Sequence, residues 1–202
     1  MSFAALYDHV MALAERWPMG RLRREAVAPS RGRVIEIAAG TGLDFQHYRA
    51  GTFVVATEPD LAMLKRARRR ASKSEAEVVL VAADAQSLPF RAGAFDTGVV
   101  ALGLCTIPLP EKALGELHRV LGPAGVVRLV EHVRVDQPVV GWVQDFLTPV
   151  WRRLAGGCRL NQRTVQIVRD AGFTIGQLDS HSGGVFVTMS AQKSATGRLN
   201  DP

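Results

Sequence analysis

A chain of 202 residues that is 47% hydrophobic and 22% charged is long enough for a single domain with its own core, expected over residues 1–193 and followed by a frayed tail, residues 194–202. Its two cysteines, Cys105 and Cys158, have neither the number typical of a disulfide framework nor the spacing of a metal site, so we expect a reducing compartment and no bound metal. The first residues lack a secretion signal and no apolar run approaches the roughly 20 residues of a membrane span, so we expect a cytoplasmic protein.

The N-terminal segment, residues 1–28, begins with a predicted amphipathic helix over residues 3–17, whose apolar positions include Leu6, Val10 and Leu13. We expect this segment to act as a helical lid. Five apolar runs further along the chain predict strands, over residues 33–38, 53–57, 78–83, 95–102 and 125–131. Helical segments separate these strands, and strand alternating with helix predicts a parallel sheet.

The helix predicted over residues 60–72 carries the densest basic run of the chain, KRARRR at residues 65–70. Apolar residues at helical spacing accompany this run, so most of its charges are expected on a solvated face. The net charge is +6 and the pI is about 10.0, yet no aromatic interleaving or reader motif supports a nucleic-acid site. We therefore expect no nucleic-acid partner.

The second half of the chain adds helices and a hairpin. Helices are predicted over residues 111–121, 138–154 and 161–171. Large apolar residues dominate residues 138–154, and we expect residues 138–171 to form the substrate side of the domain. Residues 173–180 and 185–191 are typical of a terminal hairpin.

Three predicted strands end at or near a carboxylate: Glu36 lies in VIEIAAGTG at residues 34–42, Glu58 follows the second strand and Asp84 follows the third. Ligands of open α/β sheets bind outside the carboxyl ends of the strands, so we expect these acids to line one crevice. A single acid at such a position is often only a helix cap. Three in register with a glycine-rich turn favour a ligand site.

A glycine turn followed about 20 residues later by an acid is also the pattern of dinucleotide-binding sites. A dinucleotide brings an anionic pyrophosphate to this turn, where Glu36 would oppose it. At an effective dielectric constant near 20, two unit charges 4 Å apart interact by roughly 4 kcal/mol, so this carboxylate favours a cation. S-adenosylmethionine carries an ammonium and a sulfonium and no phosphate, and its hydroxyls and adenine amine can donate to Glu58 and Asp84.

These residues resemble the class I S-adenosylmethionine-dependent methyltransferases, in particular the methyltransferase type 11 group. The resemblance covers about residues 30–131 and rests on VIEIAAGTG, ATEPD, AADAQSLPF, FDTGVVALGL and LHRVLGPAGVVRLVEH in this order. It implies a Rossmann-like α/β fold, with a seven-stranded, mostly parallel sheet, helices on both faces and an antiparallel C-terminal hairpin. It also implies S-adenosyl-L-methionine as cofactor and S-adenosyl-L-homocysteine as product.

The same resemblance implies which residues bind the cofactor. They are Glu36, Ala38, Gly40, Thr41 and Gly42 around the methionine part, Glu58 and Pro59 near the ribose, Asp84 and Ala85 near the adenine, and Ala101 and Leu102 near the sulfonium. Tyr7 is a further candidate in the lid. The family usually has glycine where this chain has Ala38, and we expect the extra methyl group to leave binding intact while shifting the methionine tail.

Residues 131–173 resemble the methyltransferase-like 7 family, the membrane-associated alkyl thiol methyltransferases. The matching features are EHV at residues 131–133, Trp142, the Pro149 and Trp151 pair, Gly157-Cys158 and the helix that follows. This resemblance implies methylation of a small lipophilic thiol. That family has an N-terminal hydrophobic anchor that this sequence does not show, so membrane residence is not carried over.

A thiol acceptor agrees with the residue types in this half of the chain. Trp142, Phe146 and Trp151, together with Cys105, are predicted to line an apolar substrate pocket, although each is also typical of a protein core. Methyl transfer depends mainly on alignment and desolvation, but a thiol must also become a thiolate. His132 is the candidate catalytic residue for this step because an unperturbed histidine titrates near neutrality; a purely structural histidine is the alternative.

Two other functions remain open. In the first, the chain methylates a lipid-linked quinone precursor or a phospholipid amine. Residues 138–154 would then make weak contact with a membrane surface through Arg152 and Arg153. Alternatively, the chain is a non-catalytic module that only binds S-adenosylmethionine.

No carboxylate cluster follows the fourth predicted strand, so no metal is implied. The residues indicate no oligomeric state.

Overall fold

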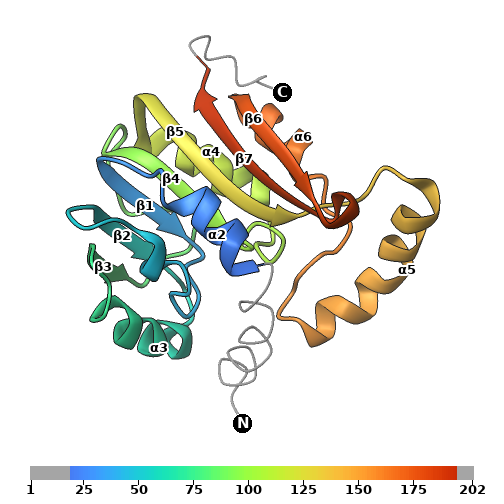
Figure 1. Ribbon diagram of the computed structural model, residues 1–202, viewed down its shortest axis with the longest axis horizontal. Coiled ribbons are helices and arrows are strands. Elements are labelled where there is room, and N and C mark those ends of the chain that lie inside the picture. The colour runs from blue at the N-terminus through green and yellow to red at the C-terminus, as the bar shows by residue number, and fades with distance from the viewer. Residues whose placement is uncertain (1–18, 195–202) are drawn as a thin grey trace.

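The computed structural model describes residues 19–194, and within this range the chain forms a seven-stranded sheet covered by helices on both faces (Figure 1). The predicted lid helix at residues 3–17, Tyr7 and residues 195–202 lie outside the described residues. The predicted α/β sheet with helices on both faces is confirmed.

The strands follow the order β3-β2-β1-β4-β5-β7-β6 across the sheet. Their bounds are β1 Arg33–Ile37, β2 Phe53–Thr57, β3 Glu77–Val81, β4 Phe95–Ala101, β5 Leu121–His132, β6 Phe173–His181 and β7 Phe186–Lys193. The first five strands pair in parallel, whereas β7 pairs antiparallel with both β5 and β6. This topology confirms the predicted parallel sheet with an antiparallel C-terminal hairpin.

Helices of both faces bury the apolar side chains of the central strands. Their bounds are α2 Gly20–Val27, α3 Leu61–Ala71, α4 Pro110–Val120, α5 Pro138–Leu154 and α6 Thr164–Asp170, with short 3₁₀ turns at η2 Phe45–His47 and η3 Ser182–Gly184. Helices α2 and α3 pack with Val34 of β1 in one apolar cluster, and α4 and α6 pack with Ile35 and Ile37 in another. Alternate residues of β1 thus point to opposite faces, as strand geometry requires.

The largest differences from the predicted boundaries are at the starts of β5 and α6. Strand β5 begins at Leu121 rather than at residue 125, because the chain remains extended through Gly122 and Leu121 already pairs with Phe95 of β4. Helix α6 begins at Thr164 rather than at residue 161. In α3 the predicted start is confirmed, since Asp60 caps the helix by accepting hydrogen bonds from the next turn.

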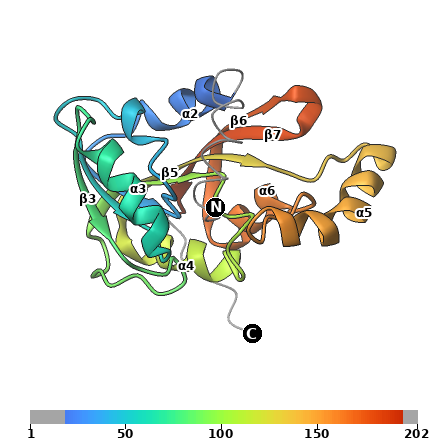
Figure 2. The ribbon, with the colours of Figure 1, turned by 90° about the horizontal axis from the view of Figure 1, so that it is seen from below.

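Helix α5 stands apart from the sheet, beyond the ends of β5 and β7, in both views of the molecule (Figures 1 and 2). Its buried residues are Gly141, Gln144 and Thr148, so it rests on the domain through a small and partly polar face. No helix between residues 19 and 194 is long and apolar enough to cross a bilayer.

Candidate functional site

A cavity of about 410 Å³ lies at the carboxyl ends of β1, β2, β3 and β4, at the edge of the sheet where the three acids were predicted to meet. The residues that line it are Ala38, Gly40, Glu58, Pro59, Asp60, Met63, Asp84, Ala85, Gln86, Leu102, Gly103, Thr106, Ile107, Pro108, Ala155 and Gly156. The loops after four strands and the loop after α5 thus line the same cavity. The size is within the range of small-molecule and cofactor sites.

The glycine-rich turn after β1 forms one side of this cavity. Ala38, Gly40 and Gly42 all have positive φ angles, of 53°, 57° and 77°. A Cβ atom at Gly40 would meet nothing within 4 Å, so the space beside this residue is open to a ligand. At Gly42 a Cβ atom would collide with the Phe45 ring, so the second glycine is required by packing.

Glu58 follows β2 and faces the cavity. Its two carboxylate oxygens accept hydrogen bonds from the backbone N–H groups of Gly40 and Asp60, both at 3.0 Å. Burial raises the pKa of this carboxyl group above its ordinary value, and the two backbone donors act against that rise. A carboxylate offers about four lone-pair positions, so two remain for a ligand with hydroxyl groups.

The remaining loops bring further predicted residues to the cavity. Asp84 accepts hydrogen bonds from the backbone and side-chain nitrogens of Gln86, which fixes the turn after β3, and Ala85 is buried beside it. Leu102 follows β4 with a φ angle of 57°. Ala101 is buried directly before Leu102 and does not itself line the cavity.

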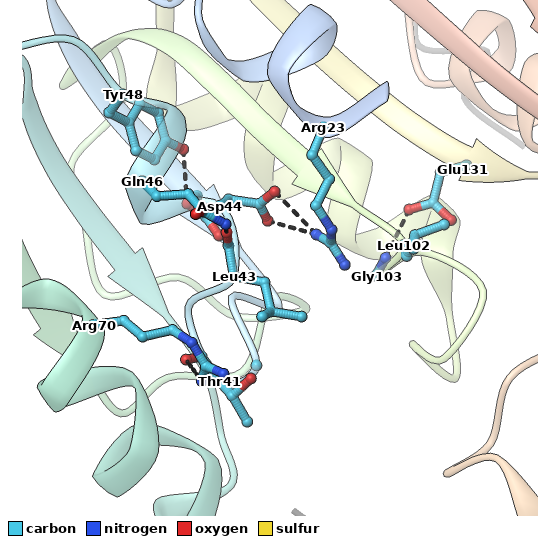
Figure 3. A network of polar contacts seen from close by, with 12 residues as sticks. Arg23, Thr41, Leu43, Asp44, Gln46, Tyr48, Arg70, Leu102, Gly103 and Glu131 are labelled. Atoms are coloured by element: carbon cyan, nitrogen blue, oxygen red, sulfur yellow. Dashed lines mark hydrogen bonds and ion pairs between the residues drawn. The ribbon is translucent and has the colours of Figure 1, made fainter. Parts of the chain in front are cut away.

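Glu131, which the sequence analysis did not single out as a site residue, holds the loop after β4 in place. One of its oxygens accepts hydrogen bonds from the backbone N–H groups of Gly103 and Leu104, at 2.8 and 2.9 Å (Figure 3). The side chain is fully buried, and this burial raises its pKa to about 7. The signal that could have marked it as a site residue is an acid at the carboxyl end of a predicted strand, directly before His132.

Glu36 does not line the cavity, although it was predicted to contact the methionine part of a cofactor. It accepts a hydrogen bond from the Tyr48 hydroxyl at 2.7 Å, and burial together with nearby Asp44 raises its pKa well above the ordinary value. Asp44 in turn accepts hydrogen bonds from Arg23 of α2 at 2.8 and 2.9 Å (Figure 3). This buried network ties α2 to the base of the glycine turn.

Thr41 is also buried rather than at the cavity surface. Its backbone carbonyl accepts a hydrogen bond from the Arg70 guanidinium at 2.8 Å (Figure 3). A basic residue of α3 thus supports the glycine turn from outside, which gives part of the KRARRR run a structural role.

A second group of predicted residues meets at the end of β5, and none of its members lines the cavity. His132, the last residue of β5, lies with its Nε2 atom 2.8 Å from the Cys158 sulfur, and the sulfur of Cys105 belongs to the same cluster. Hydrogen bonding from Cys105 and contact with His132 lower the pKa of Cys158 to about 4, whereas the pKa of Cys105 is raised by its bond to Cys158 and by burial. The cluster therefore favours one thiolate at neutral pH.

The predicted aromatic pocket wall is not assembled around the cavity. Trp142 and Phe146 stack on each other with ring centroids 5.7 Å apart, but on the outer face of α5, where they are 65% and 69% exposed. Trp151 lies closer to the site, since its indole N–H donates to the Cys158 sulfur at 3.3 Å. Among these three residues, only Trp151 contacts the cluster.

The cavity lining agrees with the requirements of S-adenosylmethionine. Two carboxylates, Glu58 and Asp84, suit a ligand with hydroxyl and amine donors. The open space at Gly40 allows a ligand to approach the protein backbone closely. Met63, Ala85 and Ile107 supply apolar surface for a flat ring. The residues present thus fit this cofactor.

Comparisons with known proteins agree with this geometry. Residues 35–129 match the family model described as a methyltransferase domain. A solved S-adenosylmethionine-dependent methyltransferase of Thermotoga maritima superimposes with a TM-score of 0.67 at 21% identity, covering 96% of this chain and 100% of that chain. At 21% identity, the likeness to the Thermotoga maritima structure concerns the fold alone.

Curated relatives extend the likeness beyond the central sheet. The thiol S-methyltransferase TMT1B of Homo sapiens is 32% identical over 154 residues, which cover 72% of this chain and 62% of that protein. The demethylmenaquinone methyltransferase of Paenarthrobacter aurescens is 37% identical over 123 residues, covering 60% of this chain and 43% of that protein. The chain therefore spans less than two thirds of the length of either relative.

Proposed function

Since this chain belongs to the class I S-adenosylmethionine-dependent methyltransferases, we propose that it methylates the sulfur of a small lipophilic thiol. The single observation that carries the choice of acceptor is the contact between His132 and Cys158, which follows the cavity-lining residues Ala155 and Gly156 in the loop after α5. The likeness to thiol S-methyltransferases supports the same choice.

In this proposal the cavity residues orient the cofactor. Glu58 accepts hydrogen bonds from the ribose hydroxyls, Asp84 from the adenine amine, and the open side of Gly40 accommodates the methionine part. Bound there, S-adenosylmethionine supplies the methyl group, whose bond to the sulfonium sulfur breaks as the bond to the acceptor sulfur forms. Glu131 positions the loop of Leu102 and Gly103 that faces the reacting atoms.

A thiol acceptor must lose its proton before or during transfer, because the thiolate is the nucleophile. His132 is the residue that promotes this loss, acting together with the cysteines that surround it. The rest of the rate comes from alignment and from exclusion of water by the buried walls around Leu104 and Ile107.

The test is methyl transfer from labelled S-adenosylmethionine to a panel of small alkyl thiols, phenols and extracted lipids, with products identified by mass spectrometry. An S-methylated product that is lost in the Glu58→Gln variant supports the proposal. A methylated lipid without any methylated thiol contradicts it. Cofactor binding without turnover on any acceptor would instead indicate a non-catalytic module.

A second candidate acceptor is a lipid-linked quinone precursor or a phospholipid amine. The observation that favours it is the exposed apolar surface of α5, where Trp142, Phe146 and Val150 face solvent beside Arg152 and Arg153. The likeness to demethylmenaquinone methyltransferases is consistent with such an acceptor.

Co-sedimentation with vesicles of phosphatidylcholine and phosphatidylglycerol at low salt tests this candidate. Binding that falls in the Phe146→Ser variant supports it, because this substitution removes one ring of the exposed stacked pair without touching the cavity. Absence of binding to these anionic vesicles would remove the candidate.

A further inference from the structure

Cys105, His132 and Cys158 come from three separate parts of the chain and meet in one place. Cys105 lies in the loop after β4, His132 ends β5, and Cys158 lies in the loop after α5. One ligand atom from each, the two sulfurs and an imidazole nitrogen, lies within 4.8 Å of the other two. Both cysteines are free thiols. Two sulfurs and an imidazole are the donor set that zinc prefers.

The spacing of these atoms suits a tetrahedral ion. Zinc binds cysteine sulfur at about 2.3 Å and histidine nitrogen at about 2.0–2.1 Å, which places ligand atoms of a tetrahedron about 3.5–3.8 Å apart. The separation of 2.8 Å between His132 Nε2 and the Cys158 sulfur is shorter than this value. An ion between them requires the two atoms to move apart by less than about 1 Å, which side-chain rotation provides.

The surroundings of the cluster suit a cation held by thiolates. The Trp151 indole donates a hydrogen bond to the Cys158 sulfur at 3.3 Å, the kind of outer contact that orients a ligating thiolate. Glu131, fully buried and next to His132 in sequence, adds a carboxyl group. A dication would balance the two thiolates in this buried place, where unpaired charge is costly.

The loop that carries Cys158 is fastened to the loop that carries Cys105. The backbone N–H of Arg159 donates to the Cys105 carbonyl at 3.0 Å, and the Arg159 guanidinium donates to the carbonyls of Ile107 and Pro108. Thr106, next to Cys105, and Gly156, two residues before Cys158, line the cavity. The cluster therefore adjoins the space in which the acceptor is expected.

We propose that Cys105, His132 and Cys158 bind one Zn²⁺ ion and leave its fourth coordination position for the sulfur of the acceptor thiol. The three-ligand site with one open position is the arrangement of catalytic rather than structural zinc. Binding of the acceptor sulfur at the fourth position rests on the proposed function, whereas zinc binding by the three residues does not. It revises the expectation of no metal, which was based on the number and spacing of the cysteines and on the lack of a carboxylate cluster after the fourth predicted strand.

In this arrangement His132 is a ligand rather than a base. Zinc binding releases to solvent the proton of the Cys105 thiol and any proton shared between His132 and Cys158, and the acceptor thiol loses its own proton to solvent as its sulfur binds the ion. The bound thiolate would then form a bond to the methyl group as the bond between that group and the sulfonium sulfur breaks, with S-adenosyl-L-homocysteine as the leaving group. The product is a neutral thioether, a weaker ligand than a thiolate, and it leaves the ion for the next acceptor.

The first experiment measures metal binding by the full chain, reduced with a phosphine and freed of metal by a chelator. Addition of Zn²⁺ is expected to give about one bound ion per chain by mass spectrometry, and Co²⁺ is expected to give tetrahedral and thiolate-to-cobalt absorption bands. Cys158→Ser and His132→Ala should each weaken binding at least about tenfold. His181→Gln, which changes a histidine outside the cluster, is the matched control and should bind as the unchanged chain does.

No stoichiometric uptake of either ion by the reduced chain overturns the zinc site. Uptake that is equal in the unchanged chain and in the Cys158→Ser and Cys105→Ser variants also overturns it, because the ion is then bound elsewhere. Folding of each variant is verified from its circular dichroism, and the cobalt spectrum of the unchanged chain tests the ligand type even where a variant does not fold.

The second experiment titrates the cobalt-loaded chain with 1-propanethiol. A change in the thiolate-to-cobalt band supports binding of the acceptor sulfur at the fourth position, and an unchanged band overturns it. Methylation of 1-propanethiol by metal-free chain would leave the proposed function standing and refute the zinc step. Zinc binding without methylation of any thiol would refute the proposed function and leave the metal site.

Discussion

The Glu58→Gln substitution tests whether the cavity at the strand ends is the cofactor site. The change preserves the shape of the side chain but removes its charge. In the structure the carboxylate accepts hydrogen bonds from the N–H groups of Gly40 and Asp60 and keeps two lone-pair positions for the ribose hydroxyls. A glutamine has one acceptor oxygen, so its NH₂ group must face one of these donors.

The expected loss follows from the removal of a charged hydrogen-bond acceptor, a contribution of about 1.5–3 kcal/mol. This corresponds to a rise of about 10- to 150-fold in the dissociation constant for S-adenosylmethionine, measured by calorimetry. The matched control is Glu116→Gln, which also removes a carboxylate that accepts a backbone N–H, but outside the cavity. Glu116→Gln should bind within about twofold of the unchanged chain. Equal affinities for all three proteins would refute the assignment of the cavity.

Three other substitutions or conditions have expected outcomes. Burial raises the pKa of Glu58, so this carboxylate takes up a proton at higher pH than an ordinary glutamate does. Affinity for S-adenosylmethionine should therefore fall as the pH is lowered from 7.5 to 5.0. Calorimetry should show no such fall for Glu58→Gln. Ala38→Gly should raise the melting temperature by about 1–4 °C, since it relieves a left-handed alanine, whereas Ala39→Gly should lower it. Gln144→Leu should lower the melting temperature by several degrees and speed amide exchange in the loop after α5. The substitution removes the partner of three backbone groups, two of them buried and one partly buried. Unchanged exchange would contradict this role.

The sheet and the cofactor side of the site were predictable because they depend on local patterns. Apolar runs that end on Glu58 and Asp84 needed only the rule that parallel strands present their carboxyl ends at one edge. The position of Glu36 was not predictable in the same way. Strand alternation turns its side chain away from Ile35 and Ile37 and toward Tyr48, so it stabilises the turn from below instead of lining the cavity.

The acceptor side could not be predicted because it depends on how distant segments meet. The spacing of Trp142 and Phe146 is that of a buried helix face, yet α5 stands apart from the sheet and leaves both rings exposed. Cys105 and Cys158 had no metal-site spacing in the sequence, since their meeting depends on the length of β5 and on the course of the chain around α5. Only the tertiary structure brings them to His132.

The placement of Cys158 depends on polar contacts rather than on apolar burial. Gln144 in the middle of α5 donates to the carbonyls of Val133 and Leu160 and accepts from the N–H of Val135, at 2.8–3.1 Å. One buried amide thus joins the segment that leaves β5 to the segment that follows Cys158. Because α5 buries so little apolar surface, these bonds fix the distance between the two segments. The sheet therefore determines where the cavity lies, and Gln144 holds the segment after Cys158 against the segment after His132.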